Sequence, residues 1–73
     1  MNRYPVRFDP DPGGGFTATF RDIPEAISQG DTLEEARDEA LDALVTAMDF
    51  YFEDSRKVPP ASASQADEEV VEL

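Results

Sequence analysis

Residues 32–52 read TLEEARDEALDALVTAMDFYF, and apolar side chains recur in this stretch every three or four positions. This spacing predicts one long amphipathic helix from Leu33 to about Phe52. Asp31 or Thr32 can cap its start, and Glu34 and Glu35 suit the first turn because they complement the positive end of the helix dipole. At about 100° per residue, the side expected to face a core holds Leu33, Ala40, Leu41, Leu44, Met48 and Tyr51, with Ala36, Ala47 and Phe52 at its flanks.

The opposite side of the same helix is almost wholly acidic. It holds Glu35, Asp38, Glu39, Asp42, Thr46, Asp49 and Glu53. Like charges four residues apart each cost a few tenths of a kcal/mol, and no Lys is interleaved to offset them. Two interpretations stay open: a solvated surface that keeps a small protein soluble, or a surface that meets a basic partner. Phe50 lies off the apolar stripe, so its ring is expected in or near solvent, where a contact with another copy or a partner would suit it.

Two runs before the helix alternate with the period of a strand. Tyr4, Val6 and Phe8 form the first run, and Phe16, Ala18 and Phe20 form the second. Residues 10–15, PDPGGG, lie between them and predict a hairpin turn. Residues 26–29 are long enough for a short third strand that ends at Gly30, and Pro5 indicates an edge position or the start of its strand.

After the helix the composition changes to Pro, Ala, Ser and Gln, and Pro59-Pro60 forbid a helical continuation. We expect a core in residues 1–54, a polar loop or mobile segment in residues 55–69, and a final, possibly truncated strand in residues 70–73. The fold class is α+β: a small two-layer domain with an antiparallel three-stranded sheet, one long helix and a final strand.

Composition excludes several classes of function. The chain has 73 residues, with 17 Asp and Glu against 6 Lys and Arg, no His and no Cys, giving a formal net charge of −11. This balance works against direct binding to a nucleic acid backbone, and it leaves out the commonest general base and the thiolate zinc sites. We therefore expect no enzyme, no cofactor and no metal. No run is long enough to span a membrane and the start lacks an apolar signal core, so we expect a cytoplasmic protein.

Several motifs in order resemble one family, the HicB antitoxins of bacterial type II toxin–antitoxin systems. The resemblance rests on RYPV at residues 3–6, GGF at 14–16, FRDIPEA at 20–26, QGDTLEEA at 29–36 and DFYFED at 49–54. It implies a partial ribonuclease H-like βββαβ domain that binds and neutralises a HicA-type toxin, a small basic protein that cleaves mRNA using a His. In this family operator DNA is bound by a C-terminal domain, which we do not expect in these 73 residues.

An acidic antitoxin can occupy an RNA-binding surface because carboxylates can stand in for phosphates. We expect a homodimer or higher oligomer with Phe50 as a contact, because so small a domain buries little surface and its acidic helix repels itself. The alternative is a small acidic oligomeric module that regulates another basic protein or binds a small ligand. The acids expected to contact the partner are Asp22, Glu25, Asp31, Glu35, Asp38, Asp42 and Asp49.

Overall fold

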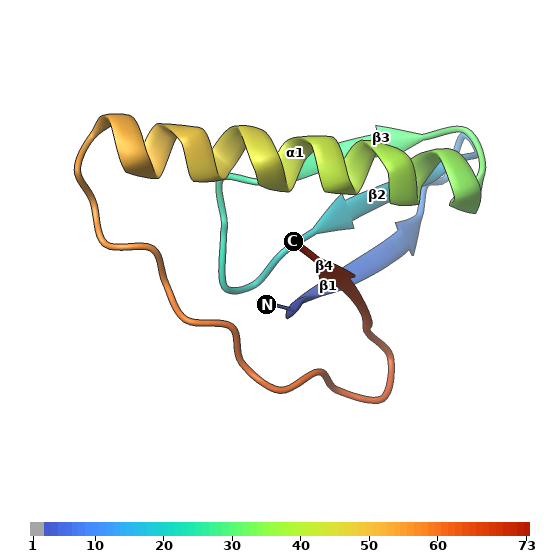
Figure 1. The fold of residues 1–73 in the computed structure, drawn as a ribbon. Helices are drawn as coiled ribbons and strands as arrows, with labels where there is room; N and C mark the ends of the chain where they lie inside the picture. The colour runs from blue at the N-terminus through green and yellow to red at the C-terminus, as the bar shows by residue number, and fades with distance from the viewer. Residues whose placement is uncertain (1–2) are drawn as a thin grey trace.

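The computed structural model describes residues 3–73 and has one helix packed on one face of a four-stranded sheet (Figure 1). The α+β class and the order of elements expected from the sequence are confirmed. The strands are β1 (Arg3–Pro10), β2 (Phe16–Thr19), β3 (Ile27–Gly30) and β4 (Glu69–Glu72), and the helix α1 (Leu33–Glu53) lies between β3 and β4 in the chain.

The sheet is antiparallel throughout, with the strand order β3-β2-β1-β4. The predicted hairpin pairs Phe8 with Ala18, and β3 continues the meander by pairing Ser28 with Ala18. β4 returns to the free side of β1, where Glu72 is opposite Arg3. The two ends of the described chain therefore lie close together (Figure 1).

The prediction that Pro5 marks an edge position is confirmed on one side of β1, because β4 pairs with Arg3–Val6 whereas β2 pairs only with Arg7–Pro10. Asp11 donates its N–H to Gly15 across the hairpin at 3.0 Å. Since N–H groups alternate between the two sides of an antiparallel strand, residue 5 points toward β2, as Asp11 does. β2 ends opposite Arg7 and does not reach Pro5. The missing N–H of the proline therefore costs no ladder hydrogen bond.

The helix begins at Leu33 as the sequence predicts, and of the two candidate caps, Asp31 and Thr32, the structure has Thr32. The Thr32 hydroxyl accepts the Glu35 N–H at 3.1 Å, and the Glu35 carboxylate accepts the Asp31 N–H at 3.0 Å. The first bond satisfies one of the N–H groups that a helix start otherwise leaves unpaired, and the second holds the residue before the cap. Glu35 therefore has a structural role in addition to its negative charge.

The core lies between α1 and the helix-facing side of the sheet. Its helical part is a narrow stripe, whereas the strands and the segment after β2 contribute larger side chains such as Tyr4, Phe20 and Ile23. The prediction that Leu41 belongs to the core is wrong, because its side chain is 42% exposed. Leu41 lies at the side of the buried stripe and not within it. The stripe consists of Ala36, Ala40, Leu44, Ala47, Met48 and Tyr51.

Small residues let the start of α1 approach β3 closely. A Cβ atom added to Gly30 would lie 2.7 Å from the Glu35 carbonyl carbon and 2.8 Å from the Ala36 Cα. Both neighbours are backbone atoms and cannot rotate away. The glycine at the end of β3 therefore fixes the distance between the strand and the first turn of the helix.

We expect Gly30→Ala to lower the free energy of unfolding by roughly 1–3 kcal/mol, the usual cost of forcing extra atoms into a packed contact. Gly13→Ala is the matched control, because no atom lies within 4 Å of a Cβ added at Gly13. Urea denaturation of both variants measures the difference. Equal stability of the two variants would contradict the close approach.

Residues 55–68 form the returning segment, which leaves the end of α1 and leads back to β4 without helix or strand structure (Figure 1). Arg21 holds it by donating to the Ser62 hydroxyl, the Ala63 carbonyl and the Glu68 carboxylate. The hydrogen bond from Arg21 is the main reason why the pKa of Glu68 lies below its usual value. The Tyr4 hydroxyl donates to the Pro59 carbonyl at 2.8 Å. The division into a core of residues 1–54 and a mobile segment stays a prediction.

Candidate functional site

Ion pairs sort the carboxylates of this chain into two groups. All five arginines are paired: Arg3 with Glu72, Arg7 with Asp9 and Asp67, Arg21 with Asp22 and Glu68, Arg37 with Glu69, and Arg56 with Glu25 and Asp54. These contacts neutralise carboxylates on the strands, in the returning segment and around the C-terminal end of α1. They bring no cation to the outer side of the helix.

The carboxylates that form no ion pair within residues 3–73 gather in one region. All but one come from α1 and the turn before it, and the exception is in the hairpin loop between β1 and β2. Most project from the exposed side of α1, which we call the acidic face: Glu35, Asp38, Glu39, Asp42, Asp49 and Glu53. The remaining three are Asp11, Asp31 and Glu34.

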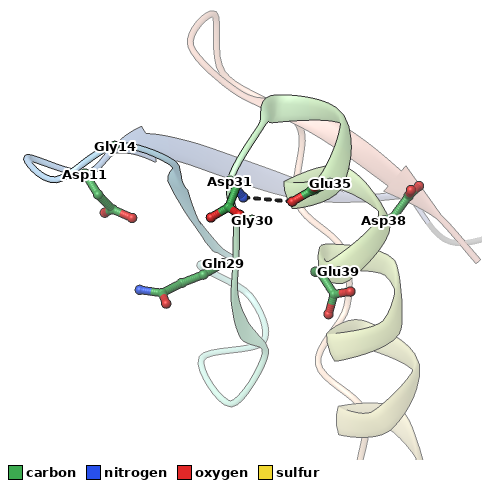
Figure 2. A pocket seen from close by; sticks show the side chains of 8 residues that line it. All are labelled: Asp11, Gly14, Gln29, Gly30, Asp31, Glu35, Asp38 and Glu39. Carbon is green, nitrogen blue, oxygen red and sulfur yellow. Dashed lines mark hydrogen bonds between the residues drawn. The ribbon is translucent and has the colours of Figure 1, made fainter.

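The acidic face begins at a hollow of about 370 Å³ beside the first turns of α1. Asp11 of the hairpin loop and Gln29 of β3 line it on one side. Figure 2 shows the Gln29 side chain directed away from α1 and Glu35 turned toward Asp31, whereas Asp38 points away from Asp31. Thr17 donates to the Asp11 carboxylate at 2.8 Å and so holds that side chain in place. Five carboxylates line this hollow: Asp11, Asp31, Glu35, Asp38 and Glu39.

A groove of about 570 Å³ continues from the hollow between β3 and α1, and Gln29 and Glu39 line both. Its acidic members are Glu25, Glu39 and Asp42. Its apolar members are Ile27, Ala43, Ala47 and Phe50. Hollow and groove together form one surface, the β3–α1 seam, which is acidic at one end and part apolar at the other.

The structure brings together some of the seven acids predicted to contact a partner and separates others. Asp31, Glu35 and Asp38 line the hollow, and Asp42 lines the groove. Asp49 belongs to the acidic face but lines neither. Asp22 lies elsewhere, since its carboxylate accepts the N–H and the hydroxyl of Ser62, each at 2.8 Å. The role of all seven as contact residues stays a prediction.

Glu25 lines the groove but is also bonded within the chain. Its carboxylate accepts the Tyr51 hydroxyl at 2.7 Å, and the Arg56 guanidinium lies 3.4 Å away while stacking over the Tyr51 ring. The hydrogen bond from Tyr51 is the largest reason why the pKa of Glu25 is below its ordinary value of 4.5. A depressed pKa in the folded state contributes stability above the unfolded pKa and loses it as the pH falls through the folded value.

We therefore expect Tyr51→Phe to be less stable than the natural chain at pH 6, with a difference that shrinks as the pH falls through the pKa of Glu25 toward pH 3. Tyr4→Phe is the matched control, because the Tyr4 hydroxyl donates to a carbonyl that does not titrate in this range. Urea denaturation at the two pH values measures both differences. A Tyr51→Phe difference that stays constant with pH would contradict the charged hydrogen bond.

The β3–α1 seam presents groups that suit the binding of another molecule. Within residues 3–73, no group of three or more His, Cys, Asp or Glu side chains has the arrangement of a metal site. The helix in the described part of the chain is not long and apolar enough to cross a membrane. The seam offers carboxylates, an amide and apolar side chains, which suit a basic protein surface.

The sequence interpretation did not single out three residues that shape the seam. Asp11 belongs to a hairpin loop, and only the tertiary fold places that loop beside the start of α1. Gln29 and Ile27 lie on β3, and Ile27 is 62% exposed although it is apolar. The period-2 pattern of so short a strand could have indicated that Ile27 and Gln29 share a face, but not that β3 is an edge.

Comparison with known proteins gives a consistent result. The family described as HicB_like antitoxin of bacterial toxin-antitoxin system matches residues 3–73. Antitoxin HicB 1 of Photorhabdus laumondii is 60% identical over 57 residues, which cover 78% of this chain and 37% of the relative. Antitoxin HicB of Escherichia coli K12 is 48% identical over 71 residues (97% and 51%), and Antitoxin HicB of Pseudomonas fluorescens Pf0-1 is 37% identical over 71 residues (97% and 48%). The chain spans about half the length of these relatives, or less.

Proposed function

Because the chain belongs to the HicB-like antitoxin family, we propose that it neutralises a basic HicA-type, mRNA-cleaving toxin by covering the toxin's RNA-binding and catalytic surface. The contact surface in this proposal is the acidic face of α1 together with the hollow at its start. The domain acts by binding and not by catalysis.

The observation that carries the proposal is the separation of paired from unpaired carboxylates. Every arginine is committed to an ion pair, and the acidic face and the hollow receive none of them. A helix surface with only one sign of charge is destabilised by repulsion between its own side chains, and no cation within residues 3–73 offsets this repulsion. A positive partner surface relieves it, and carboxylates can accept the Lys and Arg hydrogen bonds that otherwise go to phosphates.

This mechanism also bears on speed and selectivity. Complementary charge steers two proteins together and raises the association rate above that of a neutral pair. A protein that binds RNA must carry a positive surface, so the toxin's own function supplies the complement. We further propose a cytoplasmic homodimer or higher oligomer that does not itself bind nucleic acid, since the exposed charge of this domain opposes a phosphate backbone.

Charge reversal at Asp38 and Asp42 tests the proposal, because both are exposed, form no ion pair within residues 3–73, and lie one turn apart. We expect the double variant Asp38→Lys, Asp42→Lys to bind at least about 100-fold more weakly, a loss of about 2.7 kcal/mol, to a toxin inactivated at its catalytic His. Calorimetric titration measures the affinity. Protection of an mRNA from the active toxin is the functional readout.

The matched control is Asp67→Lys, Glu72→Lys, which changes the net charge equally but lies beside and on β4. We expect its affinity to fall less than about tenfold, since a distant surface charge is largely screened at physiological salt. Equal losses in both double variants would show a general charge effect and contradict the assigned surface. No binding by the natural chain would contradict the antitoxin mechanism and favour an acidic module with another partner.

A further inference from the structure

The direction in which each backbone group of β1, β2 and β3 points within the sheet follows from one turn hydrogen bond and the strand register. Asp11 donates its N–H across the first hairpin to Gly15. Because N–H and C=O groups alternate between the two sides of an antiparallel strand, Thr17 and Thr19 of β2 bond to β1. Ala18, between them, bonds in the other direction, toward β3.

The same alternation identifies the free groups of β3. Ser28 is paired with Ala18, so Ser28 directs its N–H and C=O toward β2. Ile27 and Gln29 direct theirs away from the sheet, because β3 is the edge strand. Among residues 3–73, no hydrogen bond of a turn, loop or cap reaches these groups. β3 therefore presents two free N–H and two free C=O groups.

The two edges of the sheet differ in how they are protected. β4 has Glu69 and Glu72 along its length and follows directly on Glu68, and charged residues of this kind discourage pairing with another strand. β3 has no charged residue and no Pro, and its Ile27 side chain is 62% exposed. An unprotected edge with an exposed apolar residue is a ready template for an added strand.

The groove beside this edge supplies the side-chain pockets that strand addition requires. Ala43, Ala47 and the exposed ring of Phe50 line it from α1, and Ser28 lines it from β3. The Ser28 hydroxyl is buried and has no hydrogen-bond partner among the described residues. Glu39 and Asp42 belong to the same groove from the helix side. A strand laid on β3 would direct alternate side chains into this mixed apolar and acidic groove.

We propose that an extended segment of the basic toxin adds to β3 as a fifth strand, with apolar and Lys or Arg side chains facing the groove; this rests on the proposed function. Charge decides between the toxin and a second copy of this chain as occupant. Joining two β3 edges would bring Glu39 and Asp42 of both copies together, whereas a basic segment neutralises them. Phe50 then contacts the toxin rather than another copy.

Gln29→Pro tests the backbone contact, because it removes an outward N–H and leaves the inward bonds of β3 in place. Gln29→Ala is the matched control, since it removes the same side chain but keeps the N–H. We expect Gln29→Pro to weaken binding of the inactivated toxin about tenfold or more relative to Gln29→Ala. Equal affinity of the two variants, both folded by circular dichroism, would overturn the proposal.

Amide hydrogen exchange of the natural chain gives a readout without substitution. We expect the Ile27 and Gln29 amides to exchange fast in the free chain and at least tenfold more slowly in the complex, because an added strand pairs with both. Suppose that Asp38→Lys, Asp42→Lys abolishes binding, but the Ile27 and Gln29 amides of the natural chain stay unprotected in its complex with the toxin. The proposed function then holds and strand addition is wrong. A second outcome would also overturn the proposal: the free chain is a dimer, Gln29→Pro dissociates that dimer, and the affinity for the toxin does not change. The β3 edge would then bind a second copy of this chain.

Discussion

The placement of positive charge is the constraint on which the surface of this domain depends. Five arginines hold together parts of the chain that lie far apart in sequence: Arg3 and Arg37 bind carboxylates of β4, and Arg21 binds the returning segment. Since these arginines are used for the fold, none remains for the outer side of α1. The acidic face follows from this arrangement, and in the proposed function a positive partner surface relieves its self-repulsion. Any ligand that binds the folded state would also stabilise it.

The close contact between β3 and the start of α1 links the fold to the candidate site. Gly30 allows the first turn of the helix to lie against the end of the strand, and Thr32 and Glu35 cap that turn. The same approach brings the carboxylates of α1 next to the free edge of β3. A single surface therefore offers both charges and backbone groups. The charges would speed the association of a partner, and the backbone groups would fix the register in which it binds.

Much of the fold could be predicted from the sequence because its signals are local. The helix, its Thr32 cap and the first hairpin each depend on residues within a few positions of one another, and the structure has all three. Leu41 was assigned wrongly because a helical wheel shows which residues share a side, but not which part of a broad apolar side meets the sheet. The buried residues Ala36, Ala40 and Ala47 are small enough to let the helix pack closely against the sheet along the buried stripe.

The candidate site was less predictable because it depends on contacts between distant segments. Asp22 and Asp38 have the same side chain in the sequence, yet Asp22 is bonded to Ser62 and Asp38 is exposed without an ion pair within residues 3–73. β3 is an edge strand because β4 pairs with β1 and not with β3. The segment that leads to β4 has no hydrophobic periodicity from which this strand order could be predicted.

In the proposed function, unpaired carboxylates on α1 bind a positive protein surface. The most direct test is to measure the affinity of the natural chain for the inactivated toxin from about 50 to about 500 mM salt. This roughly tenfold range of salt shortens the electrostatic screening length severalfold. We expect tight binding that weakens steeply as salt rises, mainly through slower association. Tight binding that does not change with salt would contradict binding through these carboxylates.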